Sequence, residues 1–118
     1  MAPMEPSIRE WVDSSGRSPF GSWFAGLGGR AAAKITVALK RLEAGNTSKV
    51  EALGGGVHEL KIDWGPGLRV YFGREGATII VLLGGGEKHR QQADIEAAKA
   101  RWADRAARPR TTARKTDD

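Results

Sequence analysis

Most residues of this chain that could do chemistry lie in one stretch, Val57–Arg74, where polar and apolar positions alternate. Leu60, Ile62 and Trp64 alternate with charged residues, and a similar alternation follows residues 65–67, which predicts two half-buried strands joined as a hairpin. The apolar residues of both strands must share one face, and a loop of residues 65–67 then pairs Trp64 with Leu68 and Ile62 with Val70. On the opposite face we expect one surface patch that contains Glu59, Lys61, Asp63, Arg69 and Tyr71.

This expected patch has the side chains that cleavage of a phosphodiester requires. Arg69 can hold two phosphate oxygens through its planar guanidinium, and Lys61 can offset the charge that develops on them. Tyr71 can exchange a proton or stack on a base, and Glu59 can accept the proton of a ribose 2′-hydroxyl. We therefore count Arg69, Lys61, Tyr71 and Glu59 as candidate catalytic residues. The alternative is an ordinary solvent-facing strand in which Asp63 and Arg69 form a cross-strand ion pair.

A second cluster begins at Gly84-Gly85-Gly86 and continues through Glu87-Lys88-His89-Arg90. A glycine-rich turn before a helix exposes backbone N–H groups to an anion, although the Gly-Lys-Ser/Thr ending of a P-loop is missing. Histidine exchanges protons near neutral pH, so His89 is a further catalytic candidate, with a solvated loop histidine as the alternative. We expect Lys88 to emerge beside it at one end of the sheet. Arg90 and Arg74 are candidate ligands of RNA phosphates. With two histidines and no cysteine in the sequence, we expect no metal site, and we expect no cofactor.

Charge and composition restrict the partners of the chain. Its 118 residues fit one domain, and 19 basic against 14 acidic residues give a net charge of +5 and a pI of about 10.0. This balance favours anionic partners, among them RNA, DNA, an acidic protein or an anionic membrane, without choosing among them. The longest apolar run, Ile79–Leu83, is too short to span a bilayer, and residues 1–7 lack the features of a signal peptide. We therefore expect a cytoplasmic protein without a membrane partner.

The elements that must position these residues follow from periodicity and turn signals. We expect strands at residues 8–12, 60–64, 68–73 and 78–83, and helices that begin at Ser18-Pro19 and cover residues 30–44 and 91–106. The tight connection at Gly28-Gly29 predicts that the first two helices form an antiparallel hairpin. The predicted fold is α+β: a small antiparallel sheet of three to four strands, with an N-terminal helical hairpin and a C-terminal helix on one face. We expect residues 1–7 to be a loose N-terminus, 8–106 the domain, and 107–118 a basic disordered tail.

Three segments together resemble a known family. The stretch GGGVHELKIDWGPGLRVYF, which ends at Phe72, resembles the hallmark of RelE/ParE-superfamily killer proteins of addiction modules. Residues 84–88 with the helix that follows, and the aromatic helix that begins at Phe20, agree with it. The resemblance covers about Ile8 to Trp102 and is closest to the HigB-like branch, also described as phage Gp49-like.

The resemblance implies a RelE-like toxin fold and, in the RelE-type branch, metal-independent cleavage of mRNA on the ribosome. Translation and growth then stop. The ribose 2′-hydroxyl attacks the adjacent phosphate, while basic residues stabilise the charge of the transition state. By position, Arg69 looks like the family's sheet arginine and Lys61 like the basic residue of the preceding strand. Lys88 and His89 lie near the place of the late catalytic residues, although the chain lacks the tyrosine that some relatives have in this last segment.

The resemblance also implies partners. Toxins of this kind are held by a co-encoded antitoxin, which in this branch is often a small helix-turn-helix DNA-binding protein. mRNA and the ribosome would be the targets of an endoribonuclease. The alternative is a ParE-type protein, which shares the fold but inhibits DNA gyrase by binding and needs no RNA chemistry.

Overall fold

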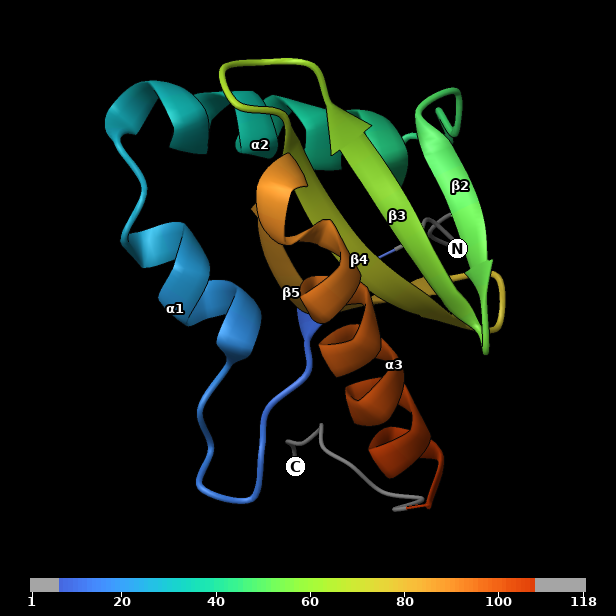
Figure 1. Cartoon of the computed structure of the whole chain (residues 1–118). Helices are drawn as coiled ribbons and strands as arrows, with labels where there is room; N and C mark the ends of the chain where they lie inside the picture. Colours follow the sequence, from blue (N-terminus) through green and yellow to red (C-terminus); the bar gives the residue numbers. More distant parts are fainter. Residues whose placement is uncertain (1–6, 108–118) are drawn as a thin grey trace.

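A five-stranded sheet with the strand order β1-β5-β4-β3-β2 organises the chain in the computed structural model, which describes residues 7–107 (Figure 1). The strands are β1 (Ser7–Glu10), β2 (Val50–Gly54), β3 (Val57–Ile62), β4 (Leu68–Glu75) and β5 (Ile79–Glu87). The helices are α1 (Pro19–Ala25), α2 (Gly29–Glu43) and α3 (Gln91–Ala107), and a short 3₁₀ turn, η1 (Lys88–Arg90), precedes α3. The predictions for residues 1–6 and for residues 108–118 lie outside the described residues.

The sheet corrects the predicted fold class. β1 runs parallel to β5, with Ser7 opposite Ile79, whereas the other neighbouring strands are antiparallel. The sheet is therefore mixed and five-stranded, and the prediction of an antiparallel sheet of three to four strands was wrong, although the chain remains α+β. β2 was missed because it is a short edge strand, mostly exposed, that ends in a register shift beside Gly54.

Helices pack on both faces of the sheet, which corrects a second part of that prediction. α1 and α2 cover one face of the sheet, and α3 covers the other face. Figure 1 shows α3 in front of the sheet, α2 across its upper part and α1 down one side. α1 packs against β5 and α2 against β3, so the two helices do not form the expected antiparallel hairpin. The apolar stripes of α1 and α2 contribute to one core on the same face of the sheet, whereas α3 packs on the opposite face.

The start of α1 was predicted correctly. Ser18 is the N-cap, and its hydroxyl oxygen accepts a hydrogen bond of 2.9 Å from the backbone N–H of Gly21. Pro19 occupies the first turn, where a missing N–H costs nothing. α1 ends at Ala25, with Gly26 as its C-cap, which is earlier than the predicted end at Gly28-Gly29. Gly28 is instead the N-cap of α2, and Gly29 is the first residue of that helix.

Two apolar cores lie on the two faces of the sheet. The larger, beneath α1 and α2, includes Phe20, Ile35, Leu42, Val70, Phe72 and Leu82. The smaller, beneath α3, includes Val57, Tyr71, Val81, Leu83 and Ala98, with Trp102 packed against it. Because α3 buries this second face, the side of the β3–β4 hairpin that the sequence predicted to face solvent is covered.

The sequence predicted that the three glycines after Leu83 end the strand, and this was wrong. The strand continues through them to Glu87. Gly85 lies directly beneath the ring of Trp23, and a Cβ atom there would clash with the indole. Gly84 and Gly86 lie beneath side chains of α3 in the same way. The glycines therefore let helices on both faces approach the strand closely. Within residues 7–107, no helix is long and apolar enough to cross a membrane.

Candidate functional site

The pairing of β3 with β4 differs from the predicted register by two residues. Lys61 lies opposite Arg69, Glu59 opposite Tyr71, and Ile62 opposite Leu68. Trp64 is not paired, because the connection folds back at Trp64, whose N–H donates to the carbonyl of Ile62 at 2.9 Å. The predicted alternation of faces holds, but the predicted pairs Trp64–Leu68 and Ile62–Val70 were wrong.

The expected surface patch does not exist as a surface. Glu59 and Tyr71 have 0% exposure and Arg69 has 8%, because α3 covers this face of the sheet. Asp63 is exposed, but its carboxylate pairs with Lys49 at 2.9 Å and not with Arg69. The patch was expected to hold two basic residues, Lys61 and Arg69, and only Lys61 is substantially exposed. The ammonium group of Lys61 lies 3.4 Å from Glu51 of β2.

A buried polar cluster replaces the patch. The Nε atom of Arg69 lies 3.7 Å from Oε2 of Glu59, and the side-chain amide of Gln91 donates to the same oxygen at 2.6 Å. Asp94 lies against Gly86, which is the cross-strand partner of Arg69. Among the described residues, four buried atoms of this cluster have no hydrogen-bond partner: Glu59 Oε1, Arg69 Nε, Tyr71 Oη and Asp94 Oδ2. Buried polar atoms are usually paired, which makes this cluster a candidate functional site.

Electrostatics fix the protonation of Tyr71. Burial raises the pKa of the Tyr71 hydroxyl far above its ordinary value, and the carboxylates of Glu59 and Asp94 raise it further. Tyr71 therefore stays protonated at neutral pH and can act there as a hydrogen-bond donor but not as a base. Burial also raises the pKa of Asp94, although Arg90, Arg101 and His89 oppose this shift.

Gln91, Asp94 and Arg101 were not predicted as residues of the site. Helical spacing places Gln91 in line with the apolar stripe of α3, and Asp94 and Arg101 at the margin of that stripe, but polar residues of a helix normally face solvent. The signal that could have found them lies in β5, because Gly84 and Gly86 leave space on the α3 face. Arg101 fills the space above Gly84, where it donates to the carbonyl of Leu83 at 2.8 Å.

A group of basic residues meets at one end of the sheet, where β3 ends and α3 begins. The backbone N–H of Lys88 donates to the carbonyl of Gly67 at 2.9 Å, which ties η1 to the β3–β4 turn. A Cβ atom at Gly67 would lie 3.4 Å from both Nη1 of Arg69 and Cβ of Lys88, so the two side chains are neighbours. We call this group the basic end; it consists of Lys61, Arg69, Lys88, His89 and Arg90.

Within the basic end, the exposed residues and the covered one have different environments. Lys88, His89 and Arg90 are exposed, whereas Arg69 lies just below the surface. Nδ1 of His89 lies 3.3 Å from Oε1 of Glu87. This contact does not involve the other ring nitrogen, Nε2. The structure thus places the Lys88–Arg90 turn, which the sequence assigned to a separate cluster, at the same end of the sheet as Lys61 and Arg69, and adds the buried cluster below them.

Arg74 lies apart from this site. Its Cα partner is Ile80, toward the opposite end of β4, and its guanidinium stacks 5.6 Å from the ring centre of Phe72. His58 stacks on the same Phe72 ring, with 5.3 Å between ring centres. Burial and the charge of Arg74 both lower the pKa of His58. These contacts give Arg74 and His58 places in the packing of the α2 face.

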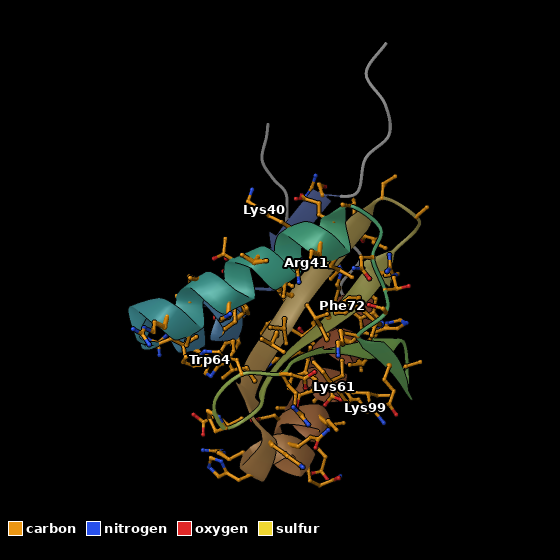
Figure 2. All side chains as sticks on the ribbon, turned by 90° about the horizontal axis from the view of Figure 1, so that it is seen from above. Lys40, Arg41, Lys61, Trp64, Phe72 and Lys99 are labelled. Atoms are coloured by element: carbon orange, nitrogen blue, oxygen red, sulfur yellow. The ribbon has the colours of Figure 1, made fainter. Side chains whose placement is uncertain are left out.

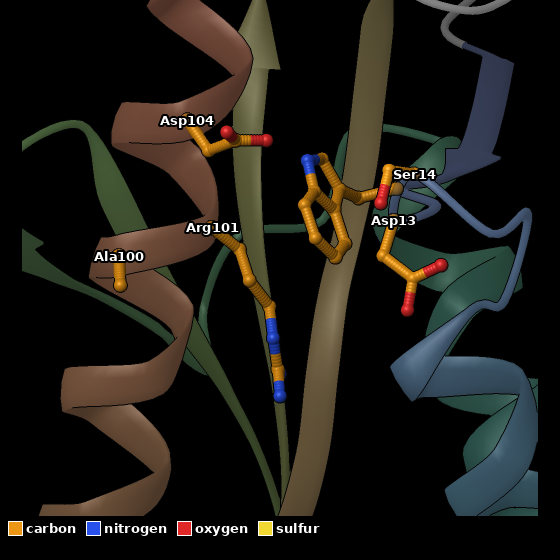
Figure 3. Close-up of a pocket in the computed structure, with 6 residues that line it drawn as sticks. Asp13, Ser14, Ala100, Arg101 and Asp104 are labelled. Carbon is orange, nitrogen blue, oxygen red and sulfur yellow. The ribbon is translucent and has the colours of Figure 1, made fainter.

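A separate pocket of about 360 Å³ lies between α3 and the loop after β1, lined by Trp11, Asp13, Ser14, Ala100, Arg101 and Asp104. Figure 3 shows Arg101 and Asp104 extending from α3 toward the loop that carries Asp13 and Ser14. The pocket contains both charges and lies farther along α3 than the basic end. Within residues 7–107, no group of three or more His, Cys, Asp and Glu side chains is placed to hold a metal ion.

No family model matches the chain. An uncharacterized protein of Haemophilus influenzae is 42% identical to it over 81 residues, which make up 68% of this chain and 82% of that relative.

Proposed function

We propose that this chain, which belongs to the same family as the uncharacterized Haemophilus influenzae protein, is the toxin of a type II toxin–antitoxin system of the RelE/ParE kind and cleaves mRNA. The observation that carries the proposal is the basic end. Three separate segments bring Lys61, Arg69 and the Lys88–Arg90 turn to one place. A phosphodiester in the act of cleavage needs such a concentration of positive charge.

The proposed chemistry needs no metal. The 2′-hydroxyl of a ribose attacks the adjacent phosphorus, the bond to the 5′-oxygen of the next nucleotide breaks, and a 2′,3′-cyclic phosphate remains. Arg69 and Lys88 stabilise the charge on the non-bridging oxygens. His89 exchanges the protons that leave the 2′-oxygen and reach the 5′-oxygen, while Glu87 holds its ring.

The covered residues have a different place in this proposal. Glu59 and Tyr71 lie beneath α3, so neither touches RNA in this conformation. Arg69 shares its buried surroundings with them, and an environment of low polarity strengthens its attraction for a phosphate. We therefore assign Glu59 and Tyr71 to the support of Arg69.

The proposed partners follow from the charge of the site. mRNA and the ribosome present phosphates to the basic end, and the proposed place of action is the cytoplasm. A cognate antitoxin, which in this branch is often a helix-turn-helix protein, would neutralise the basic end with acidic side chains.

The test is primer extension on cellular mRNA after brief induction of the chain without an antitoxin. We expect discrete cuts within translated frames, which Arg69→Ala and His89→Ala abolish. Arg74→Ala is the matched control, because it removes an arginine from the same strand at a distance from the basic end. Thermal unfolding checks that Arg69→Ala still folds, and His89 is exposed, so its loss does not disturb the core. Cuts that persist in both variants would contradict the proposal.

A second candidate function is the ParE-type inhibition of DNA gyrase without chemistry. The burial of Glu59 and Tyr71 favours it, because the basic end is then left without an exposed tyrosine or glutamate of the hairpin to move a proton. Arrested growth with intact mRNA, an induced DNA-damage response and inhibited supercoiling by purified gyrase would support this alternative.

A further inference from the structure

Three elements meet at one carboxylate oxygen beneath the basic end. Gln91, the first residue of α3, donates from Nε2 to Oε2 of Glu59 on β3 at 2.6 Å. The same Oε2 atom lies 3.7 Å from Nε of Arg69 on β4. Glu59 thus lies between a helix residue on one side and the arginine of the proposed site on the other.

The amide of Gln91 is what fixes this carboxylate. The separation of 3.7 Å from Arg69 is an ion pair but too long for a hydrogen bond. The second oxygen of Glu59, Oε1, has no hydrogen-bond partner within residues 7–107. Glu59 has 0% exposure, so bulk water does not orient it. The Gln91 amide is therefore the closest donor that orients the Glu59 carboxylate, and the Tyr71 hydroxyl lies near the same group.

The carboxylate in turn faces one edge of the Arg69 guanidinium. Nε lies 3.7 Å from Oε2 of Glu59, whereas Nη1 lies beside the Gly67 turn and the stem of Lys88. A guanidinium is planar, so an anion fixed at its Nε edge determines the direction in which the remaining N–H groups point. In this chain that direction is toward the basic end.

We propose that Gln91 and Glu59 are positioning residues: Gln91 holds Glu59, and Glu59 orients Arg69 toward the phosphate that the basic end would bind. The part of this inference that concerns RNA rests on the proposed function. The part that concerns the orientation of Arg69 does not. Gln91 therefore makes the first turn of α3 part of the site, although Gln91 itself touches no substrate.

The experiment compares substitutions at Gln91 with one at its neighbour. Gln92→Ala is the matched control, because the exposed Gln92 amide makes its contact of 3.2 Å with Glu96 on the same helix. The first readout is the ¹H–¹⁵N resonance of Arg69 Nε, identified by its loss in Arg69→Lys. We expect Gln91→Ala to shift and broaden this resonance and Gln92→Ala to leave it unchanged.

Two further variants separate orientation from packing. Gln91→Glu has nearly the same shape but removes the donor and adds a like charge beside Glu59. Gln91→Lys changes the shape but keeps a donor. If the hydrogen bond orients Arg69, the Nε resonance moves most in Gln91→Glu and least in Gln91→Lys. If Gln91 merely fills space, the order is reversed and the inference is overturned.

The second readout is cleavage of mRNA on programmed ribosomes. A misdirected guanidinium lowers transition-state stabilisation, so we expect kcat to fall by about 10- to 100-fold in Gln91→Ala with little change in KM. If the wild-type chain cleaves but the Gln91 variants change neither kcat nor the Arg69 resonance, the positioning role is wrong and the proposed function stands. If the wild-type chain cleaves nothing while the resonance still follows Gln91, the proposed function is wrong and the positioning of Arg69 stands.

Discussion

Two histidines of this chain lie in opposite environments, and this difference separates their uses. His89 is exposed at the basic end beside Glu87, where solvent and a substrate can reach its ring. His58 is half-buried and stacks on Phe72 with an angle of 18° between the rings. His58 also lies opposite Phe72 in the hairpin, so its ring belongs to the packing of that face.

The burial of His58 predicts a pH dependence of stability. Burial, and then the charge of Arg74, lower the pKa of the folded-state ring below 6.5, the ordinary value. Between these two values the unfolded chain binds more protons than the folded chain. The stability that neutral His58 contributes is therefore complete above 6.5 and is lost as the pH falls through the lowered pKa.

Urea unfolding at a series of pH values measures this dependence. We expect His58→Phe, which keeps a flat ring on Phe72, to lose less stability than the wild type as the pH falls from about 7.5 to 5. His89→Gln removes the exposed histidine and should keep the wild-type fall. Parallel curves for His58→Phe and the wild type would exclude this role.

At the scale of elements, the glycines of β5 determine how closely the helices approach the sheet. Gly85 faces α1 and accommodates Trp23, whereas Gly84 and Gly86 face α3 and accommodate Arg101 and Asp94. Gly84 is the cross-strand partner of Tyr71, so the space above Gly84, which the Arg101 side chain fills, lies next to the buried cluster. A strand without side chains on two faces is weak by itself, and the helices that cover it must stabilise it.

Gly85→Ala tests this arrangement, because its new methyl group would clash with the Trp23 ring. We expect a loss of about 1–3 kcal/mol in the free energy of unfolding, as is typical of an overpacked core. Gly29→Ala is the control, since a Cβ atom at Gly29 meets nothing within 4 Å. Trp23→Leu should recover part of the loss in the Gly85→Ala background, and chemical denaturation measures all four proteins. Equal stability of Gly85→Ala and the wild type would show that α1 does not need the notch.

Local patterns in the sequence predict where helices and strands lie better than they predict which strands pair with one another. The three helices and the two hairpin strands appear at or near their predicted residues, because periodicity and caps such as Ser18 are local signals. The pairing of Ser7 with Ile79 is not local, so the parallel strand arrangement was not predictable from either segment. The glycines of β5 indicated a break because the side chains that pack over them come from α1 and α3 and not from the strand itself.

The sequence predicted which hairpin residues share one face of the sheet but not that this face is buried. Alternation placed Glu59, Arg69 and Tyr71 on one face, which the structure confirms. Whether that face meets water depends on α3, whose apolar residues Ala98 and Trp102 bury it. No property of the hairpin sequence reports this cover, so three residues expected at the surface lie in the interior.

For the whole molecule, the positive charge has a second location beyond the basic end. Arg30, Lys34 and Arg41 are exposed and recur on one side of α2, since their spacing follows the helical repeat. In the part of the chain that the structure describes, none of the three forms an ion pair with a carboxylate. Figure 2 shows Lys40 and Arg41 on α2 and places Lys61 and Lys99 toward the other side of the sheet.

This distribution predicts how the proposed binding of RNA would depend on salt. Each phosphate contact that is lost reduces the slope of log K against log salt by about 0.7 for single-stranded RNA. We therefore expect the triple variant Arg30→Gln, Lys34→Gln, Arg41→Gln to show a shallower slope while its cleavage positions stay the same. Lys99→Gln, on α3, is the control and should not change the slope. Titration of a fluorescent RNA at several salt concentrations measures both, and an unaltered slope in the triple variant would restrict RNA to the basic end.

The pairing of β1 with β5 also has a consequence for folding during translation. Ser7 finds its partner in Ile79, so an emerging chain holds an unpaired first strand until most of the domain has been translated. Gln91, which holds Glu59, leaves the ribosome later still. A chain that stops before α3 holds all five strands but lacks the Gln91 amide. The pairing of β1 with β5 joins segments that are far apart in the sequence, and contacts of this kind slow folding.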